Sequence, residues 1–247
     1  MDAVILAAGL GTRLRPYTLT TPKPLLPVRG RPVLDWTLGV LPKFVDRVVV
    51  VVNYLAEQVE EYLRRQTHFR EWVTVRQAEP RGSGDALRSC REQVRSERFL
   101  VLNGDDLYGA ADLAALAACP AGVLVYPVDD PPHWGIAFLK PDGTLEKLVE
   151  KPKLEGRHLA NTGVYLFPRE VFDIPLALSS RGEYEITDCV TKLAERGTVN
   201  VVTAKFWLPI GNIEAWQKAQ GVELEAMMSG RSLTSGTGSS SSRTPPS

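Results

Sequence analysis

The stretch AVILAAGLGTRLRPYTLTTPKPLLPV, residues 3–28, joins an apolar run to a loop rich in glycine, proline and positive charge. The run, residues 3–8, predicts a buried first β-strand. Gly9 and Gly11 leave backbone N–H groups of the loop open to a phosphate. Residues 1–31 hold one acidic residue and five cations, namely Asp2, and Arg13, Arg15, Lys23, Arg29 and Arg31. The loop predicts a local anion site, and a plain turn with solvated cations is the alternative.

Further along the chain, short β-branched runs alternate with helical patterns. RVVVVV (47–52) is apolar after its first residue, which is typical of a strand covered on both faces of a parallel sheet. Other strand candidates are WVTVRQ (72–77), FLVLNG (99–104) and GVLVYPV (122–128). Helix-like spacing occurs in PVLDWTLGVL (32–41), AEQVEEYLRRQ (56–66) and GSGDALRSCREQV (82–94). This order predicts an α/β fold, a Rossmann-like, mostly parallel sheet flanked by helices.

The second part of the chain has a different pattern of predicted secondary structure. WGIAFLKPDGTLEKLVEKP (134–152) places a Pro-Asp-Gly turn between two strand-like runs, which predicts a hairpin and an added antiparallel part. Residues 229–247 are almost entirely Ser, Thr, Gly, Pro and Arg, which predicts a low-complexity, disordered tail. We therefore expect a single domain over residues 1–228.

Composition limits the partners. The chain has 247 residues with 29 basic and 29 acidic side chains, so no global field favours nucleic acid or an anionic membrane. Cys90, Cys119 and Cys189 are odd in number and far apart, which favours reduced thiols in a cytosol. No apolar stretch approaches the ~20 residues of a membrane span. We expect a cytoplasmic protein with no nucleic-acid or membrane partner.

The residues around the glycine loop also carry a family resemblance. LAAGLGTRLRPYTLTTPKPLLPVRGRPVLDW (6–36) closely resembles the sugar-1-phosphate nucleotidyltransferases, in particular the glucose-1-phosphate thymidylyltransferase and uridylyltransferase types. Further motifs follow in the family's order to about residue 225. They are RQAEPRGSGDAL (76–87), NGDDLY (103–108), HWGIA (133–137), LVEKP (148–152), ANTGVYLF (160–167) and GEYEITD (182–188). The β-helix that many relatives append has no counterpart in the residues that follow.

The resemblance implies that a nucleoside triphosphate and a sugar-1-phosphate condense to a nucleotide sugar and pyrophosphate. Arg13 would then hold the β- and γ-phosphates, Lys23 would lie against the nucleophile and the α-phosphate, and Lys151 would pair with the anomeric phosphate. Arginine suits the first role because its planar fork grips phosphate oxygens in pairs. The nucleotide-binding residues implied are Ala8, Gly9, Gly11, Thr12, Gln77, Pro80, Gly82 and Ser83.

Base and sugar recognition are assigned in the same way. The Gln77 amide can pair with a base edge through both donor and acceptor, and Gly82 lets the backbone approach the ring. Relatives read a pyrimidine here, so dTTP or UTP is favoured. Ser83 is also expected to cap the following helix. The sugar-binding residues implied are Gly135, Glu150, Asn161 and Thr162, while Trp134 is left open between packing on the sugar and filling the core.

Asp105 ends an apolar run, where open α/β sheets place ligand-binding groups, and the resemblance implies that it binds Mg²⁺. Asp106 points the other way by alternation, so turn capping competes with a catalytic role. Relatives typically carry Trp-x-Asp-Ile-Gly, whose aspartate shares the metal, but this chain reads WLPIGN (207–212) with Pro209 at that place. Asn212 could replace the lost ligand, water could, or the chain could have become a sensor that needs no metal.

Other classes of protein remain as alternatives. A regulatory homologue that binds nucleotide sugars would keep the pocket and lose the cations, whereas Arg13, Lys23, Asp105 and Lys151 are all present. A metal-dependent glycosyltransferase on the same scaffold would lack the Pro-Lys-Pro loop. A purine-specific enzyme that uses GTP is a further alternative. The sequence leaves open which sugar is used, whether uracil or thymine is read, and whether the chain forms a homo-oligomer.

Overall fold

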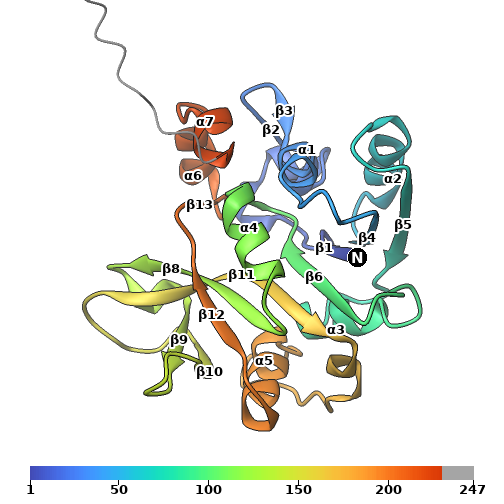
Figure 1. Ribbon diagram of the computed structural model, residues 1–247. Coiled ribbons are helices and arrows are strands. Elements are labelled where there is room, and N and C mark those ends of the chain that lie inside the picture. The colour runs from blue at the N-terminus through green and yellow to red at the C-terminus, as the bar shows by residue number, and fades with distance from the viewer. Residues whose placement is uncertain (230–247) are drawn as a thin grey trace, which may run out of the picture.

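A mixed sheet of nine strands organises residues 1–229, the part of the chain that the computed structural model describes. Its strands are β1 (Asp2–Leu6), β4 (Arg47–Val52), β5 (Glu71–Arg76), β6 (Arg98–Asn103), β8 (Gly122–Val128), β9 (Gly135–Leu139), β10 (Leu145–Glu150), β11 (His158–Pro168) and β12 (Asn200–Thr203). The order is β10-β9-β11-β6-β1-β4-β5, with β8 paired to β11 and β12 paired to β8. Within this sheet all strands except β10 and β11 run in one direction (Figure 1).

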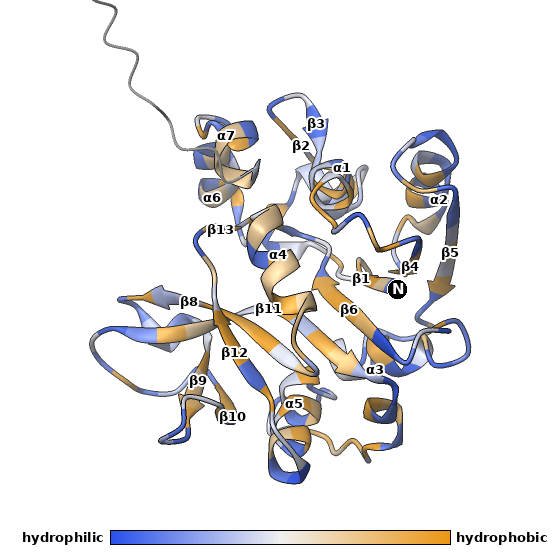
Figure 2. Ribbon diagram, in the orientation of Figure 1, coloured by the Kyte–Doolittle hydropathy of each residue, from blue (hydrophilic) through white to orange (hydrophobic). Residues whose placement is uncertain are grey.

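Helices cover both faces of the sheet. The α-helices are α1 (Val33–Gly39), α2 (Ala56–Arg65), α3 (Ser83–Ser89), α4 (Ala110–Ala117), α5 (Ile186–Arg196), α6 (Ile213–Ala219) and α7 (Leu224–Ser229). Alternation along β1 decides which face each residue meets, because successive side chains point to opposite sides. Ile5 packs in one core with α1, α2 and α4, whereas Val4 packs in the other with α3 and α5. Figure 2 shows the inner strands β1, β4 and β6 as largely hydrophobic ribbons between these layers.

A third apolar cluster joins the C-terminal helices to the start of the chain. It contains residues of α1, α6 and α7, and of the strand pair β7 (Asp106–Tyr108) and β13 (Trp207–Pro209). Val28 joins it from β2 (Pro27–Val28), which pairs with β3 (Arg31–Pro32) as a hairpin. Trp36 and Ile210 are among its buried members. Because β7 follows β6 directly, this cluster fixes the chain that leaves the sheet at Asp105.

The predicted fold class is confirmed. Between β1 and α1 the glycine loop passes through 3₁₀ turns, and α1 begins at Val33, within the helical pattern predicted over 32–41. The helix predicted over 82–94 ends at Ser89. The 3₁₀ turns are η1 (Thr12–Leu14), η2 (Tyr17–Leu19), η3 (Lys23–Leu25), η4 (Pro131–His133) and η5 (Arg169–Asp173).

The predicted tail begins at Ser229, which the structure places as the last residue of α7. Residues 230–247 lie outside the described part of the chain. No helix over residues 1–229 has both the length and the apolar character that crossing a membrane would require. The three cysteines are free thiols, and Cys90 and Cys189 are buried in the core.

Candidate functional site

Two adjoining cavities lie at the carboxyl ends of β1 and β6. The first has a volume of about 430 Å³ and the second of about 690 Å³. All eight residues predicted to bind the nucleotide line the first cavity. The second is lined by Arg13 and Lys151 and by the four residues predicted to bind the sugar. Both cavities share a wall formed by Lys23, Ser83, Asn103, Asp105 and Glu183.

The glycine loop is held at Gly11 and open at Gly9. Gly11 has φ +63°, and a Cβ there would lie 2.8 Å from Cγ2 of Thr18. The Thr18 hydroxyl also donates to the carbonyl of Gly11 at 2.7 Å. A Cβ on Gly9 would meet no described atom within 4 Å. The loop is therefore fixed against the protein at one glycine, while the other leaves its backbone accessible from the first cavity.

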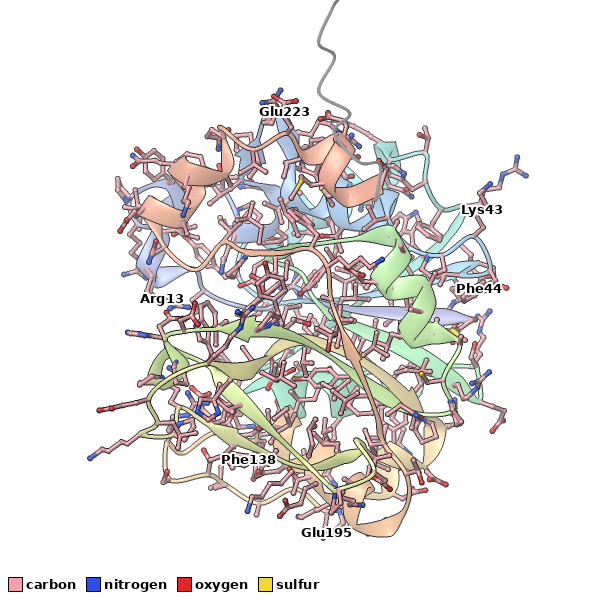
Figure 3. The ribbon with its side chains drawn as sticks, turned by 60° about the vertical axis from the view of Figure 1, so that its left-hand side comes forward. Arg13, Lys43, Phe44, Phe138, Glu195 and Glu223 are labelled. Carbon is pink, nitrogen blue, oxygen red and sulfur yellow. The ribbon has the colours of Figure 1, made fainter. Side chains whose placement is uncertain are left out.

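The turn at Thr12–Leu14 divides the loop between the two cavities. Thr12 lines the first cavity, whereas Arg13 lines the second. The Arg13 guanidinium lies 3.8 Å from the point where a Cβ on Gly211 would stand. Figure 3 shows Arg13 on the side of the molecule opposite Lys43. The guanidinium therefore faces the loop that follows β13, beyond the shared wall.

Lys23 and Asp105 form an ion pair where the cavities meet. The Lys23 side chain is 9% exposed and that of Asp105 is 34% exposed. Pro22 and Pro24 flank Lys23 in the turn that begins at this lysine, so their fixed φ angles stiffen its backbone. The pair places one buried cation and one accessible carboxylate at the junction.

Asp106 also lines the second cavity, but its carboxylate bonds to partners other than Lys23. Its carboxylate accepts hydrogen bonds from Nε1 of Trp207 at 3.1 Å and from the backbone N–H of Ile210 at 3.2 Å. Burial, together with the neighbouring charge of Asp105, raises the pKa of Asp106 to about 7. Asp106 thus ties β7 to the segment after β13, which is a positioning role.

The residues at this junction offer a divalent metal few ligands. Pro209 stands opposite Asp106 in the β13–β7 register. Oδ1 of Asn212 accepts the backbone N–H of Ala215 at 2.8 Å as the N-cap of α6, so this oxygen already has a donor. Among residues 1–229 no three His, Cys, Asp or Glu side chains gather as metal ligands. The donor set fits a Mg²⁺ that binds Asp105 and takes its other ligands from substrate phosphates and water.

The loop that carries Gly82 is joined to the segment before α5. Gly82 has φ +106°, and a Cβ there would stand 2.5 Å from the carbonyl oxygen of Tyr184. The N–H of Gly84 donates to that same oxygen at 2.8 Å. The prediction that Ser83 caps its own helix is wrong. Gly82 is the N-cap residue of α3, and the Ser83 hydroxyl accepts the N–H of Ile186, the first residue of α5.

A bulge in β11 shapes the floor of the second cavity. The register of β11 against β8 shifts between Asn161 and Val164, which places two extra residues in the strand and re-aims their neighbours. The Thr162 hydroxyl donates to the carbonyl of Leu124 at 2.9 Å, so this side chain holds the bulge in place. Nδ2 of Asn161 donates to the hydroxyl of Tyr165 at 2.7 Å.

Gly163 at this bulge gives a prediction. It has φ +77°, and a Cβ there would stand 2.0 Å from Nδ2 of Asn103 on the shared wall. Gly163→Ala should lower the free energy of unfolding, measured with urea, by roughly 1–3 kcal/mol more than the control Gly143→Ala. Gly143 has φ +82° but a Cβ there meets no described atom within 4 Å, so both variants carry the φ strain. Equal losses of unfolding free energy in Gly163→Ala and Gly143→Ala would show that the Asn103 side chain moves aside at little cost.

Both acidic and basic side chains line the second cavity. Burial raises the pKa of Glu150, whose Oε1 would lie 3.2 Å from a Cβ on Gly135. A larger residue than glycine would therefore press on this carboxylate. Lys151 has φ +46°, an uncommon backbone conformation for a residue other than glycine, and such strain clusters at functional sites.

The structure adds residues that the sequence reasoning missed. Arg181, Glu183 and Glu185 line the second cavity, and Arg181 pairs with Glu185 at 2.7 Å. The charge pair four residues apart beside the GEYEITD motif was the available signal. Trp134, left open above, packs edge-on against Trp207 with ring centres 4.9 Å apart and also lines the cavity. It is part of the wall and of the core at once.

The fold belongs to a known class. A solved UDP-glucose pyrophosphorylase from Acinetobacter baumannii superposes with a TM-score of 0.76 over 89% of this chain and 91% of that chain, at 22% identity. This likeness supports the α/β nucleotidyltransferase fold.

The family model described as nucleotidyl transferase matches residues 2–225, and the chain belongs to this family. It is 32% identical to the bifunctional protein GlmU of Methanocaldococcus jannaschii over 85% of this chain and 51% of that protein. It is also 32% identical to mannose-1-phosphate guanylyltransferase 1 of Arabidopsis thaliana, over 85% of this chain and 61% of that one. The chain thus spans about half to three-fifths of the length of these relatives.

Proposed function

We propose that this protein condenses a nucleoside triphosphate, with dTTP or UTP favoured, and a sugar-1-phosphate into a nucleotide sugar and pyrophosphate. The observation that carries the proposal is the Lys23–Asp105 pair on the wall shared by two cavities. Nucleotidyl transfer requires two anions to meet at one phosphorus atom, so a buried cation belongs at such a junction. Similarity to GlmU and to a guanylyltransferase supports the same class of reaction.

In the proposed reaction an oxygen of the sugar phosphate attacks the α-phosphorus. A new P–O bond forms as the bond from the α-phosphorus to the pyrophosphate oxygen breaks, and no covalent enzyme intermediate is required. Positioning and charge neutralisation supply the catalysis. Lys23 would lie against the α-phosphate and its nucleophile, and Arg13 would stabilise the departing pyrophosphate. The shared wall would bring the two substrates together.

Mg²⁺ is proposed as the cofactor, with Asp105 as its protein ligand. When bound, the ion would supply positive charge that neutralises the phosphates. Asp105 suits this role because its carboxylate is partly accessible from both cavities.

The base would occupy the first cavity, beside Gln77 and Gly82. A pyrimidine is favoured on the resemblance to thymidylyl- and uridylyltransferases. GTP is the second candidate, and the similarity to a plant guanylyltransferase is the observation that favours it. The sugar would occupy the second cavity, where Glu150 and Asn161 can accept and donate hydrogen bonds to its hydroxyls.

The test is pyrophosphate release across a matrix of triphosphates and sugar-1-phosphates. Turnover with UTP or dTTP and glucose-1-phosphate, or another sugar-1-phosphate, is expected. Release that requires GTP would select the second candidate. Pyrophosphate formed at the same rate without any sugar phosphate would contradict the proposed transfer, because water would then be the acceptor.

Lys151 provides a test of which substrate each cavity holds. Lys151 lines only the second of the two cavities, so Lys151→Ala should raise the KM for the sugar-1-phosphate about 10- to 100-fold, the scale of a lost charge-assisted hydrogen bond. The KM for the triphosphate should change little. Lys153→Ala, which removes an exposed charge two residues away, is the control. An equal rise in the KM values for both substrates would show that Lys151 has been assigned to the wrong side of the site.

A further inference from the structure

Gln77 is held at the back of the first cavity by its main chain. It directly follows β5, and its N–H donates to the carbonyl of Val52 at 2.9 Å. Its own carbonyl accepts Nδ2 of Asn53 at 2.6 Å. The residue is 4% exposed and lines the cavity. Its side chain therefore has little freedom to choose another direction.

Both hydrogens of the Gln77 amide are already used. Nε2 donates to Oδ2 of Asp85 at 2.9 Å and to the carbonyl of Gly82 at 3.2 Å. A carboxylate and a carbonyl can only accept, so the NH₂ group must face them, and a flipped amide would set oxygen against oxygen. The expectation that this amide offers both a donor and an acceptor to a base is therefore wrong.

Asp85 is itself fixed in this position. It lies in the first turn of α3, and its side chain is 18% exposed. Its second oxygen, Oδ1, lies 3.3 Å from an NH₂ nitrogen of Arg81. Asp85 thus holds Gln77 with one oxygen and is held by Arg81 with the other.

Only Oε1 of Gln77 remains for a ligand, and no hydrogen bond within residues 1–229 uses it. Among the described residues Oε1 does not count as a buried unpaired atom, but a base bound in the first cavity would cover it. An acceptor that is covered without a donor is costly, so a base that supplies an N–H there is preferred. Uracil and thymine carry N–H at N3, and guanine carries it at N1. Cytosine at N3 and adenine at N1 carry a lone pair instead, which would oppose the glutamine oxygen at the ring position. Their N–H groups on this edge are exocyclic, so a cytosine or adenine would have to shift from the position of uracil to use them.

We propose that Asp85 is a specificity-determining residue, which restricts the nucleotide to bases with a ring N–H by presenting Gln77 to the cavity only as an acceptor. The inference rests on the proposed function, because it places the base of the triphosphate in the first cavity. Asp85 acts through Gln77 and is a positioning residue.

The test compares the affinities of UTP and CTP, which differ in the base only at this hydrogen-bonding edge. Binding is measured by calorimetry with Mg²⁺ and without sugar phosphate, so that it does not depend on turnover. The protein should bind UTP about 10- to 100-fold more tightly than CTP, the scale of one unsatisfied buried polar group. In Asp85→Ala, Nε2 gains a free hydrogen and the amide can turn, so the ratio should fall to within about threefold.

Two further variants separate specificity from mere structural damage. Asp85→Asn keeps an oxygen for Nε2 and should retain most of the discrimination. Glu79→Ala removes an exposed carboxylate of the same loop that has no bond to Gln77, and should leave the ratio unchanged.

The outcomes distinguish this inference from the proposed function. Equal affinities for UTP and CTP in the unaltered protein would overturn the inference and leave the proposed transfer reaction standing. The same would follow if Asp85→Ala lowered the affinities for UTP and CTP by the same factor. Failure to bind any triphosphate would overturn both. Selective binding without turnover on any sugar phosphate would retain the inference and remove the proposed catalysis.

Discussion

Arg13→Ala is expected to lower turnover by roughly two to three orders of magnitude, the scale for losing one preorganised electrostatic contact with developing charge. The guanidinium lines the second cavity, and no hydrogen bond or ion pair within residues 1–229 uses it. The fold should therefore survive the substitution. The measurement is kcat for pyrophosphate release at saturating substrates, with a denaturant unfolding curve on the same preparation.

The control for this prediction removes a positive charge elsewhere. Lys43 lies on the opposite side of the molecule in Figure 3 and is exposed, so Lys43→Ala should leave kcat within about twofold. If a correctly folded Arg13→Ala variant turned over at the normal rate, this residue would have no part in the reaction.

Asp105→Ala should abolish measurable activity, because the proposed Mg²⁺ would lose its protein carboxylate and Lys23 loses its partner. The unaltered enzyme should need an unusually high Mg²⁺ concentration for saturation, since Pro209 supplies no ligand oxygen opposite Asp106. Pro209→Asp, which adds a carboxylate to the lining of the second cavity, should lower the Mg²⁺ concentration at half-maximal rate. All three proteins, namely Asp105→Ala, the unaltered enzyme and Pro209→Asp, are compared by measuring the initial rate as a function of Mg²⁺ concentration.

Pro209→Ala is the matched control, because it removes the proline and adds neither a charge nor a ligand oxygen. It should leave the Mg²⁺ requirement close to that of the unaltered enzyme. If the protein binds a nucleotide sugar but is inactive at every Mg²⁺ concentration, the chain is a sensor, and the catalytic proposal falls.

Local sequence signals predicted the fold well where burial decides the structure. The apolar run of β4 is covered on both faces, and the turn at 141–143 joins β9 to β10 as a hairpin. These features depend on neighbours in the chain. The 3₁₀ turns after β1 depend on contacts within the loop, such as the packing of Thr18 against Gly11, and on distant residues, such as Tyr54, whose hydroxyl donates to the carbonyl of Leu19. Periodicity carries no sign of either.

The sequence named many of the residues that line the two cavities, but it missed Arg181, Glu183 and Glu185 and did not foresee the hydrogen bonds of the candidate site. Resemblance supplied Gln77 and Ser83, and both line the first cavity. Their partners were not foreseen, because Ser83 meets Ile186 across 103 positions of sequence and Gln77 meets Asp85 only after α3 has formed. A motif shows which side chains gather, whereas folded geometry decides which of their polar atoms stay free.

The hydrogen bonding between residues 81–84 and residues 184–186 limits how this protein can be redesigned. Three backbone or side-chain hydrogen bonds hold the two segments together, namely Gly84 N to Tyr184 O, Tyr184 N to Arg81 O, and Ile186 N to the Ser83 hydroxyl. A chimera that grafts only the first segment from a relative would leave its donors and acceptors mismatched. The transplantable unit is therefore the pair of segments, and a loop exchange intended to alter base preference has to carry both.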